Sequence, residues 1–190
     1  MNADAVHIIE FWFDSLDGDD SRAEWFRNDP AFDALIQQRF GALIESALAG
    51  ELTHWMQASR PALARILLLD QFTRNVFRNT PRAFAGDPMA LAAARDMVAK
   101  KLDRTLPAYQ RWFVYLPFEH AEDMAAQHEG LKQFAVLAWQ EPRCEAAFEW
   151  ALKHYDVMVR FGRYPHRNAA LRRTSTEAEL EFLHQAGSTF

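Results

Sequence analysis

The sequence predicts an all-α protein with about eight or nine helices. Apolar residues recur three and four positions apart along nearly every segment, a spacing typical of helices with one buried face. Several segments begin at a polar residue followed by proline, which is a helix-start signal. No segment alternates apolar and polar residues between hairpin turns, so a sheet is not expected. Short connections favour antiparallel helix pairs, and without a low-complexity linker we expect one domain over residues 1–190.

Helices in the first part of the chain have clear boundaries. A short apolar helix comes first, and an acidic loop, DSLDGDDS (14–21), follows it. Asp29 before Pro30 is typical of a helix N-terminus, because aspartate accepts hydrogen bonds from free amides and proline fits the first turn. Gly50 is expected to end the helix that starts there.

Proline also marks the helices of the second part. Asp87 before Pro88 repeats the N-cap signal. Pro107 opens another helix, which Pro117 is expected to bend or restart. The remaining helices are expected through 131–137, from Pro142 to Gly162, and in the tail after two overlapping capping boxes, Thr174 to Glu177 and Thr176 to Glu179.

Composition narrows the classes of function. A net charge of −5 argues against a general nucleic-acid binder, which usually carries a basic surface. Cys144 is the one cysteine, so no intrachain disulfide can form. No apolar run approaches the ~20 residues that cross a membrane, and the N-terminus lacks the basic start of a signal peptide. We expect a cytoplasmic protein that binds neither nucleic acid nor membrane, and we predict no oligomeric state.

A charged pair interrupts the most apolar helix of the chain, which is expected from Ser59 to about Phe77. Asp70 and Arg74 continue a stripe with Leu63 and Leu67 at spacings of three and four, so they share the buried face. Unpaired buried charges destabilise a protein by several kcal/mol (about 3–5 when one partner is removed), so these two should be paired. Taken alone, such a pair most simply fixes the register of a central helix.

Polar groups recur in two other apolar settings. One is YLPFEHAED, in which Glu119, His120 and Glu122 lie beside bulky apolar residues. The other is RFGRYPHRNAAL, in which Arg163, His166 and Arg167 surround a helix end and a proline-led restart. Cationic side chains and free amides at a helix start suit a phosphate or carboxylate. A simpler explanation is a C-cap at a glycine, with arginines that neutralise the last helix carbonyls.

The segments LLLDQFTRNVFRNTPRAFAGD, YLPFEHAED and GRYPHRNAALRRTSTEAELEFL resemble those of a bacterial family, Domain of Unknown Function 924. The resemblance runs from EFWF (10–13) to the tail and implies a tetratricopeptide-like, right-handed superhelical array of helices, with no established activity. The matching positions are Asp70, Gln71, Phe72, Arg74, Asn75, Arg78, Pro81, Arg82, Pro117, His120, Glu122, Gly162, Arg163, Pro165, His166, Arg167, Asn168, Arg173, Ser175 and Thr176.

Four positions depart from the family pattern, which has proline at Thr73 and Glu177 and glycine at Asn79 and Arg172. The substitution at position 172 matters most. If the backbone there needs a positive φ, arginine strains it, and if the position borders a ligand, arginine narrows the pocket.

Two hypotheses about function follow from these motifs. In the first, the protein is a binding protein or an enzyme for an anionic small molecule. In the enzyme, His120 or His166 is the acid–base group, and Asp70 or Glu122 orients it. The candidate ligand-binding residues are Arg74, Asn75, Arg78, Arg163, Arg167 and Asn168. In the second, the helical array is a scaffold that binds a protein or peptide. Polar groups within apolar helices favour the first hypothesis, because a scaffold should instead present them along an open groove.

Metal and thiol chemistry have weaker support. Two Glu-x-x-His pairs, Glu51/His54 and Glu181/His184, have the spacing found in di-iron sites, but no matching pair of glutamates on other helices accompanies them. His120, Glu122 and His166 could bind a single metal ion if the fold brings them together, and this set is somewhat better supported than the di-iron spacing. Cys144 is more typical of a small core residue than of a reactive thiol. We therefore predict no metal and no cofactor.

Overall fold

The computed structural model describes residues 2–185 and 187–188, and this part of the chain is helical with no strand. The predicted all-α class and the number of helices are confirmed. The α-helices are α1 (Ala3–Phe13), α2 (Pro30–Leu48), α3 (Ser59–Ile66), α4 (Thr73–Val76), α5 (Asp87–Ala99), α6 (Ala108–His120), α7 (Met124–Gln140), α8 (Glu145–Phe161) and α9 (Glu177–Leu183).

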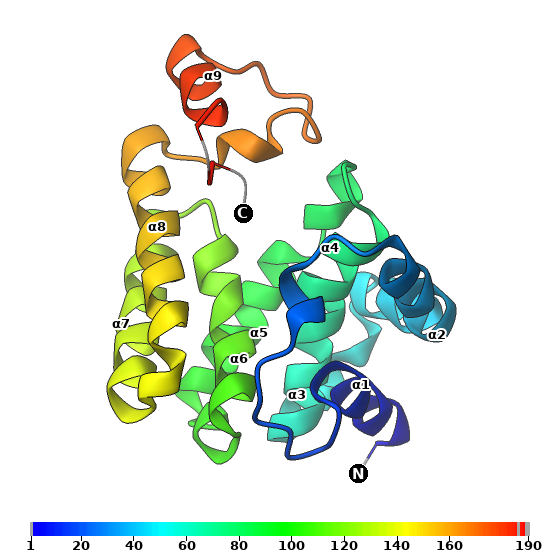
Figure 1. The fold of residues 1–190 in the computed structure, drawn as a ribbon. Coiled ribbons are helices and arrows are strands. Elements are labelled where there is room, and N and C mark those ends of the chain that lie inside the picture. The colour runs from blue at the N-terminus through cyan, green and yellow to red at the C-terminus, as the bar shows by residue number, and fades with distance from the viewer. Residues whose placement is uncertain (1, 186, 189–190) are drawn as a thin grey trace.

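From α5 to α8, each helix packs against the next one along the chain, whereas α1 packs against α3 (Figure 1). Helix α7 packs between α6 and α8, and α3 packs against α1, α5 and α6. The short helix α9 lies beyond the end of α8, away from α1 (Figure 1). This layered arrangement of consecutive helices is compatible with a tetratricopeptide-like superhelix.

The charged helix is central, and it contains a π-helical turn. Helix α3 passes directly into a π-helix, η3 (Leu67–Phe72), and then into α4. All six residues of η3 are buried. A π-turn holds one more residue than an α-turn and is found frequently at functional sites. Its position is notable because Asp70 lies within it.

Most predicted helix boundaries are confirmed. Asp29 accepts hydrogen bonds from the first amides of α2, at 3.0 and 3.2 Å. Gly50 and Gly162 follow α2 and α8 with φ of 80° and 67°, as expected of glycines that end helices. Of the two overlapping capping boxes, the structure forms the one from Thr176 to Glu179. Pro117, by contrast, does not restart a helix, because α6 continues through it to His120.

The two positions at which the resemblance leads us to expect glycine adopt backbone conformations that favour glycine. Asn79 has a φ of 60° and Arg172 has a φ of 56°. Left-handed conformations of this kind are unfavourable for most residues with a Cβ atom, and asparagine tolerates them better than arginine. The strain expected at Arg172 is therefore present.

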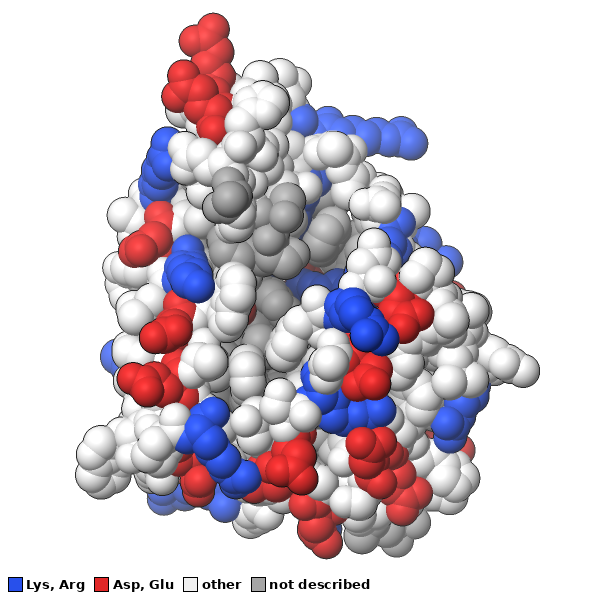
Figure 2. Space-filling model, in the orientation of Figure 1, with Lys and Arg blue, Asp and Glu red and all other residues white. Residues whose placement is uncertain are grey.

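The core is one large cluster of apolar side chains from α1 to α8. A smaller cluster, Val157, Met158 and Tyr164, joins α8 to the segment after it. On the outside, acidic and basic side chains alternate over the face drawn in Figure 2. Among the described residues, no helix is both long enough and apolar enough to cross a membrane.

Candidate functional site

Asp70 is the centre of a buried polar network. Its side chain is fully buried, and its Oδ1 lies 2.7 Å from Nδ1 of His120 and 3.1 Å from Nη1 of Arg74. The amide of Gln71 donates to the other carboxylate oxygen at 2.6 Å. Burial alone would raise the pKa of Asp70, but Arg74 and His120 outweigh burial and hold that pKa well below its usual value. Asp70 is therefore ionised and paired.

Asp87 extends this network, and its predicted role was wrong. The Asp-Pro sequence predicts an N-cap, yet α5 begins at Asp87 itself, and the carboxylate does not cap the helix. It accepts two hydrogen bonds from Arg74, at 2.9 and 3.0 Å, and a third from Arg167 at 3.2 Å. Two guanidinium groups from distant parts of the chain thus hold the carboxylate away from the helix amides.

Arg167 is the most unusual member of the network. It is 5% exposed, and its guanidinium lies between two aromatic rings, 4.8 Å from the centre of Phe84 and 4.6 Å from that of Tyr164. Its side chain donates one hydrogen bond within the described residues, to Asp87, and its Nε has no acceptor there. Burial and the neighbouring Arg74 lower the pKa of Arg167.

His120 contacts Asp70 through its Nδ1. Because ionised Asp70 can only accept, the proton of a neutral His120 is on Nδ1, which leaves a lone pair on Nε2. Burial and the charge of Arg74 outweigh Asp70 and lower the pKa of His120, so the ring is neutral near pH 7. The side chain is 14% exposed. The alternative pairing of His120 with Glu122 is not the one that forms.

A second pair, which the sequence analysis missed, lies beside His120. Nδ1 of His154 lies 3.1 Å from Oε1 of Glu119 and donates to the carbonyl of Trp150 at 2.9 Å. Burial raises the pKa of Glu119 well above its usual value and lowers that of His154 well below, so both are uncharged. His154 interrupts an apolar stripe on α8 formed by Ala147, Ala151 and Met158, and this signal was available in the sequence.

His166 belongs to the same region but carries no charge there. Its ring lies 5.7 Å from that of Tyr164, which in turn lies 5.5 Å from the ring of His154. Burial, together with the charges of Arg167 and Arg74, lowers the pKa of His166 to about 3. At neutral pH the ring is therefore neutral and adds no positive charge for an anion.

Three of the predicted site residues instead connect the tail to the rest of the molecule. Arg163 donates to both carboxylate oxygens of Glu179, at 2.6 and 2.8 Å. Asn168 donates to the same residue at 3.3 Å. Glu122 accepts two hydrogen bonds from Arg173, at 2.6 and 2.9 Å. The restart after Gly162 is a three-residue turn, η7 (Pro165–Arg167), rather than a helix long enough to bind an anion at its N-terminus.

Two further candidate ligand-binding residues, Asn75 and Arg78, contact helix α2 instead. Asn75 donates to Asp33 of α2 at 2.6 Å, and Arg78 donates to the same carboxylate at 2.5 and 3.0 Å. These contacts hold α4 against α2. The structure does not bring Asn75 and Arg78 together with His120.

The described residues contain no group of three or more His, Cys, Asp or Glu side chains placed to hold a metal ion. Cys144 is buried, and burial raises the pKa of its thiol to about 11. A thiol of that kind is a poor nucleophile at neutral pH, which agrees with a core residue.

Comparison with known proteins places these motifs in a family. Residues 8–187 match the model of the bacterial protein family of unknown function DUF924. The chain belongs to this family. A solved structure of a protein of unknown function from Agrobacterium tumefaciens is 36% identical to this DUF924 member, with a TM-score of 0.84. The match covers 95% of this chain and 96% of that one. No curated protein matches this member of the family.

Proposed function

We propose that this protein binds a small anionic molecule where Asp70, Arg74, His120 and Arg167 meet. The observation that carries the proposal is Arg167, a buried guanidinium with one hydrogen bond to a described residue. Guanidinium donors form a planar fork that matches carboxylate and phosphate oxygens. The rings of Phe84 and Tyr164 pack against this guanidinium, with their centres 4.8 and 4.6 Å from its central carbon, and limit its movement.

The incomplete pairing of Arg167, rather than the net charge of the network, supports an anion. Arg74 and Arg167 are matched in number by Asp70 and Asp87, and the nearby histidines and Glu119 are neutral. An anion at Arg167 would offset the desolvation of its guanidinium, which a single 3.2 Å contact with Asp87 only partly compensates.

The same arrangement supports acid–base chemistry on the bound molecule. Asp70 holds His120 with Nδ1 protonated, which leaves Nε2 as the acceptor of a proton. A carboxylate that orients an imidazole in this way is a recurring general-base device. The proposal is therefore an anion-binding protein whose His120 can act as a base toward the ligand.

Thermal denaturation with added anions tests the proposal. The panel is inorganic phosphate, phosphate monoesters and small dicarboxylates at matched ionic strength. Binding at about 100 times the dissociation constant is expected to raise the melting temperature by roughly 5–10 °C. Arg167→Gln should abolish the response, and Arg167→Lys should weaken it by removing the fork while keeping the charge.

Arg82→Gln is the matched control. Arg82 pairs with Glu45 at 2.7 Å, but both side chains are more than half exposed. Its loss should leave the response unchanged. If no anion stabilises the protein in an Arg167-dependent manner, the network has only a structural role, and the scaffold hypothesis becomes the better one. A scaffold is less favoured because Asp70 and Arg167 are buried between helices rather than displayed on an open surface.

A further inference from the structure

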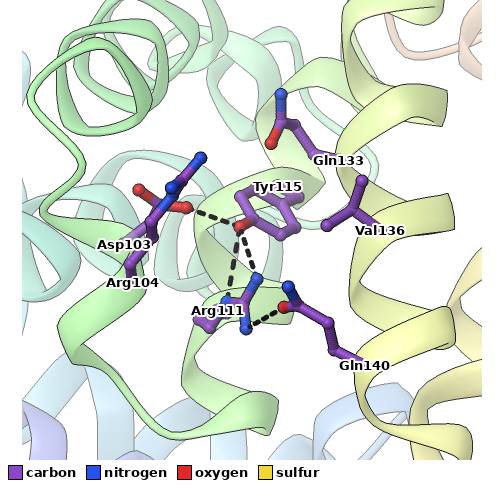
Figure 3. Close-up of a pocket in the computed structure, with 7 residues that line it drawn as sticks. All are labelled: Asp103, Arg104, Arg111, Tyr115, Gln133, Val136 and Gln140. Carbon is purple, nitrogen blue, oxygen red and sulfur yellow. Dashed lines mark hydrogen bonds between the residues drawn. The ribbon is translucent and has the colours of Figure 1, made fainter.

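A separate pocket lies between helices α6 and α7. Its volume is about 280 Å³, near the lower end of the range for small-molecule sites. Helix α6 forms the back, α7 forms one side, and a short turn, η5 (Asp103–Thr105), forms the other (Figure 3). The lining residues are Asp103, Arg104, Arg111, Tyr115, Gln133, Val136 and Gln140. None of them belongs to the network around Asp70.

Arg111 has donors that its neighbours leave available. Its Nη1 donates to the amide oxygen of Gln140 at 3.0 Å. Its Nε and Nη2 both reach the hydroxyl of Tyr115, but at 3.5 Å, the long limit for a hydrogen bond. A guanidinium has five N–H donors, so two are unused and two more are weakly held.

Arg104 and two amides add to this excess of donors. Arg104 is exposed, and within the described residues its side chain makes no ion pair or hydrogen bond. The amide of Gln133 is likewise without a hydrogen bond there, and the NH₂ group of Gln140 stays available because only its oxygen is used. The pocket wall therefore offers many more donors than acceptors.

Asp103 holds the side chain of Tyr115 in place at the back of the pocket. The hydroxyl of Tyr115 donates to Oδ2 of Asp103 at 2.6 Å, so its lone pairs face Arg111. Asp103 is 3% exposed, and its Oδ1 is buried with no partner in the described residues. The carboxylate of Asp103 thus accepts a hydrogen bond from Tyr115 and does not pair with Arg104 or Arg111. With two arginines and one aspartate, the lining has an excess of positive charge.

We propose that this pocket is a second binding site, for a small multivalent anion such as a phosphate monoester or a di- or tricarboxylate. One acidic group binds between Arg104 and Arg111, and the amides of Gln133 and Gln140 bind the remaining oxygens. The side chain of Val136 and the ring of Tyr115 contact the carbon part of the ligand. The shared chemistry is a donor-rich, positively charged wall of limited volume.

The test is an NMR titration of the ¹⁵N-labelled protein. The probes are inorganic phosphate, phenyl phosphate and citrate, each at constant ionic strength. Saturable shifts are expected in the side-chain NH₂ signals of Gln133 and Gln140, with phenyl phosphate or citrate binding at least tenfold more tightly than inorganic phosphate. The choice between these two probes distinguishes a phosphate ester from a polycarboxylate.

Substitutions separate this site from the one at Arg167. Arg104→Gln and Arg111→Gln should each weaken the titration at least tenfold, whereas Arg167→Gln should leave it unchanged. Arg39→Gln is the charge-matched control, because Arg39 is an exposed arginine on α2, outside the pocket. Because Arg104 is exposed, its variant is expected to fold, and that result decides the matter. Shifts that do not saturate, or that are equal in Arg104→Gln and Arg39→Gln, would overturn the proposal.

Discussion

The network around Asp70 and the pocket beside Arg111 differ in how far their arginines are paired with carboxylates. In the network, Asp70 and Asp87 are shared between Arg74 and Arg167, so each guanidinium has a carboxylate partner within the protein. In the pocket, Arg104 and Arg111 lie next to open volume and have donors to spare. The comparison shows that the carboxylates within reach decide whether a guanidinium mainly holds helices together, as Arg74 does, or keeps donors for a ligand, as Arg111 does.

Helix α6 links the two regions. Tyr115 lines the pocket, and Glu119 lies one turn further along the same helix, next to His120. The predictions that follow test whether the network is structural at its centre and whether the pocket is dispensable for folding. They run from the largest expected effect to the smallest.

Asp70→Ala should have the largest effect on stability. The substitution leaves Asp87 as the one carboxylate shared by Arg74 and Arg167, and removing one partner of a buried pair costs about 3–5 kcal/mol. Urea denaturation at pH 7 measures this loss. An unfolding midpoint equal to that of the wild type would show that Asp70 does not hold the network together.

A double variant sharpens that result. Replacing Asp70 and Arg74 together by Leu and Met removes both charges, and Asp87 then pairs with Arg167 alone. The double variant should cost less than Asp70→Ala, because every charge that remains in the network still has a partner of opposite charge. A larger cost would mean that the two side chains contribute through packing rather than through charge.

Tyr115→Phe should also destabilise the protein, by about 2–3 kcal/mol, although it lies in the pocket. The change removes the one hydrogen bond that a described residue donates to the buried carboxylate of Asp103, and a buried charged acceptor is expensive to leave unsatisfied. Thermal denaturation at pH 7 measures the loss. A change below about 0.5 kcal/mol would mean that a water molecule replaces the hydroxyl of Tyr115 as the donor to Asp103. The hydrogen bond between these two residues would then be as dispensable for folding as Arg104 is expected to be.

His166→Gln should change how stability depends on pH. The pKa of His166 is about 3 in the folded protein and about 6.5 when unfolded, so the unfolded state binds more protons as pH falls below 6.5. The wild type should lose about 2 kcal/mol from this group by pH 5. The difference in unfolding free energy between variant and wild type isolates the contribution of His166. Glu119, whose pKa is raised, changes stability in the opposite direction, but it does so in both proteins and cancels in the difference. A constant difference between pH 7 and 5 would contradict the buried, neutral state of His166.

Arg104→Gln should have the smallest effect on folding. Arg104 is exposed and makes no ion pair among the described residues, so its unfolding free energy should stay within about 0.5 kcal/mol of the wild type. The same urea series measures it. A loss near that of Tyr115→Phe would mean that the pocket arginines hold the fold, and the contrast between the two regions would disappear.

Local signals were sufficient to predict most of the fold. Asp29, Gly50 and Gly162 each act on their nearest neighbours, through a cap or through a positive φ, so their roles can be inferred from a few adjacent residues. The same reasoning placed Asp70 and Arg74 on a buried face, since the spacing of apolar residues fixes the orientation of a helix.

The rest of the site depended on contacts between distant segments. Asp87 has the sequence of an N-cap, and only the fold brings Arg74 and Arg167 to it. Arg163 lies in a segment whose residues are typical of an anion site, yet its guanidinium donates to Glu179 on α9. The apolar pattern from Leu67 to Phe72 is equally compatible with α and π hydrogen bonding, so it could not predict the π-turn.

That π-turn determines what the deletion of a single residue would do to this helix. Because η3 contains one residue more per turn than an α-helix, deleting a single residue between Leu67 and Phe72 would let the whole segment from Ser59 to Val76 close as regular α-helix. An α-helix turns the chain by about 100° per residue and a π-turn by less, so the extra residue is taken up within the turn itself. After loss of one of the three leucines Leu67–Leu69, Arg74 would therefore keep its direction toward Asp87. In a gene of this kind, an in-frame loss of one of those codons would disturb the packing of the turn and leave the helix on either side of it in phase.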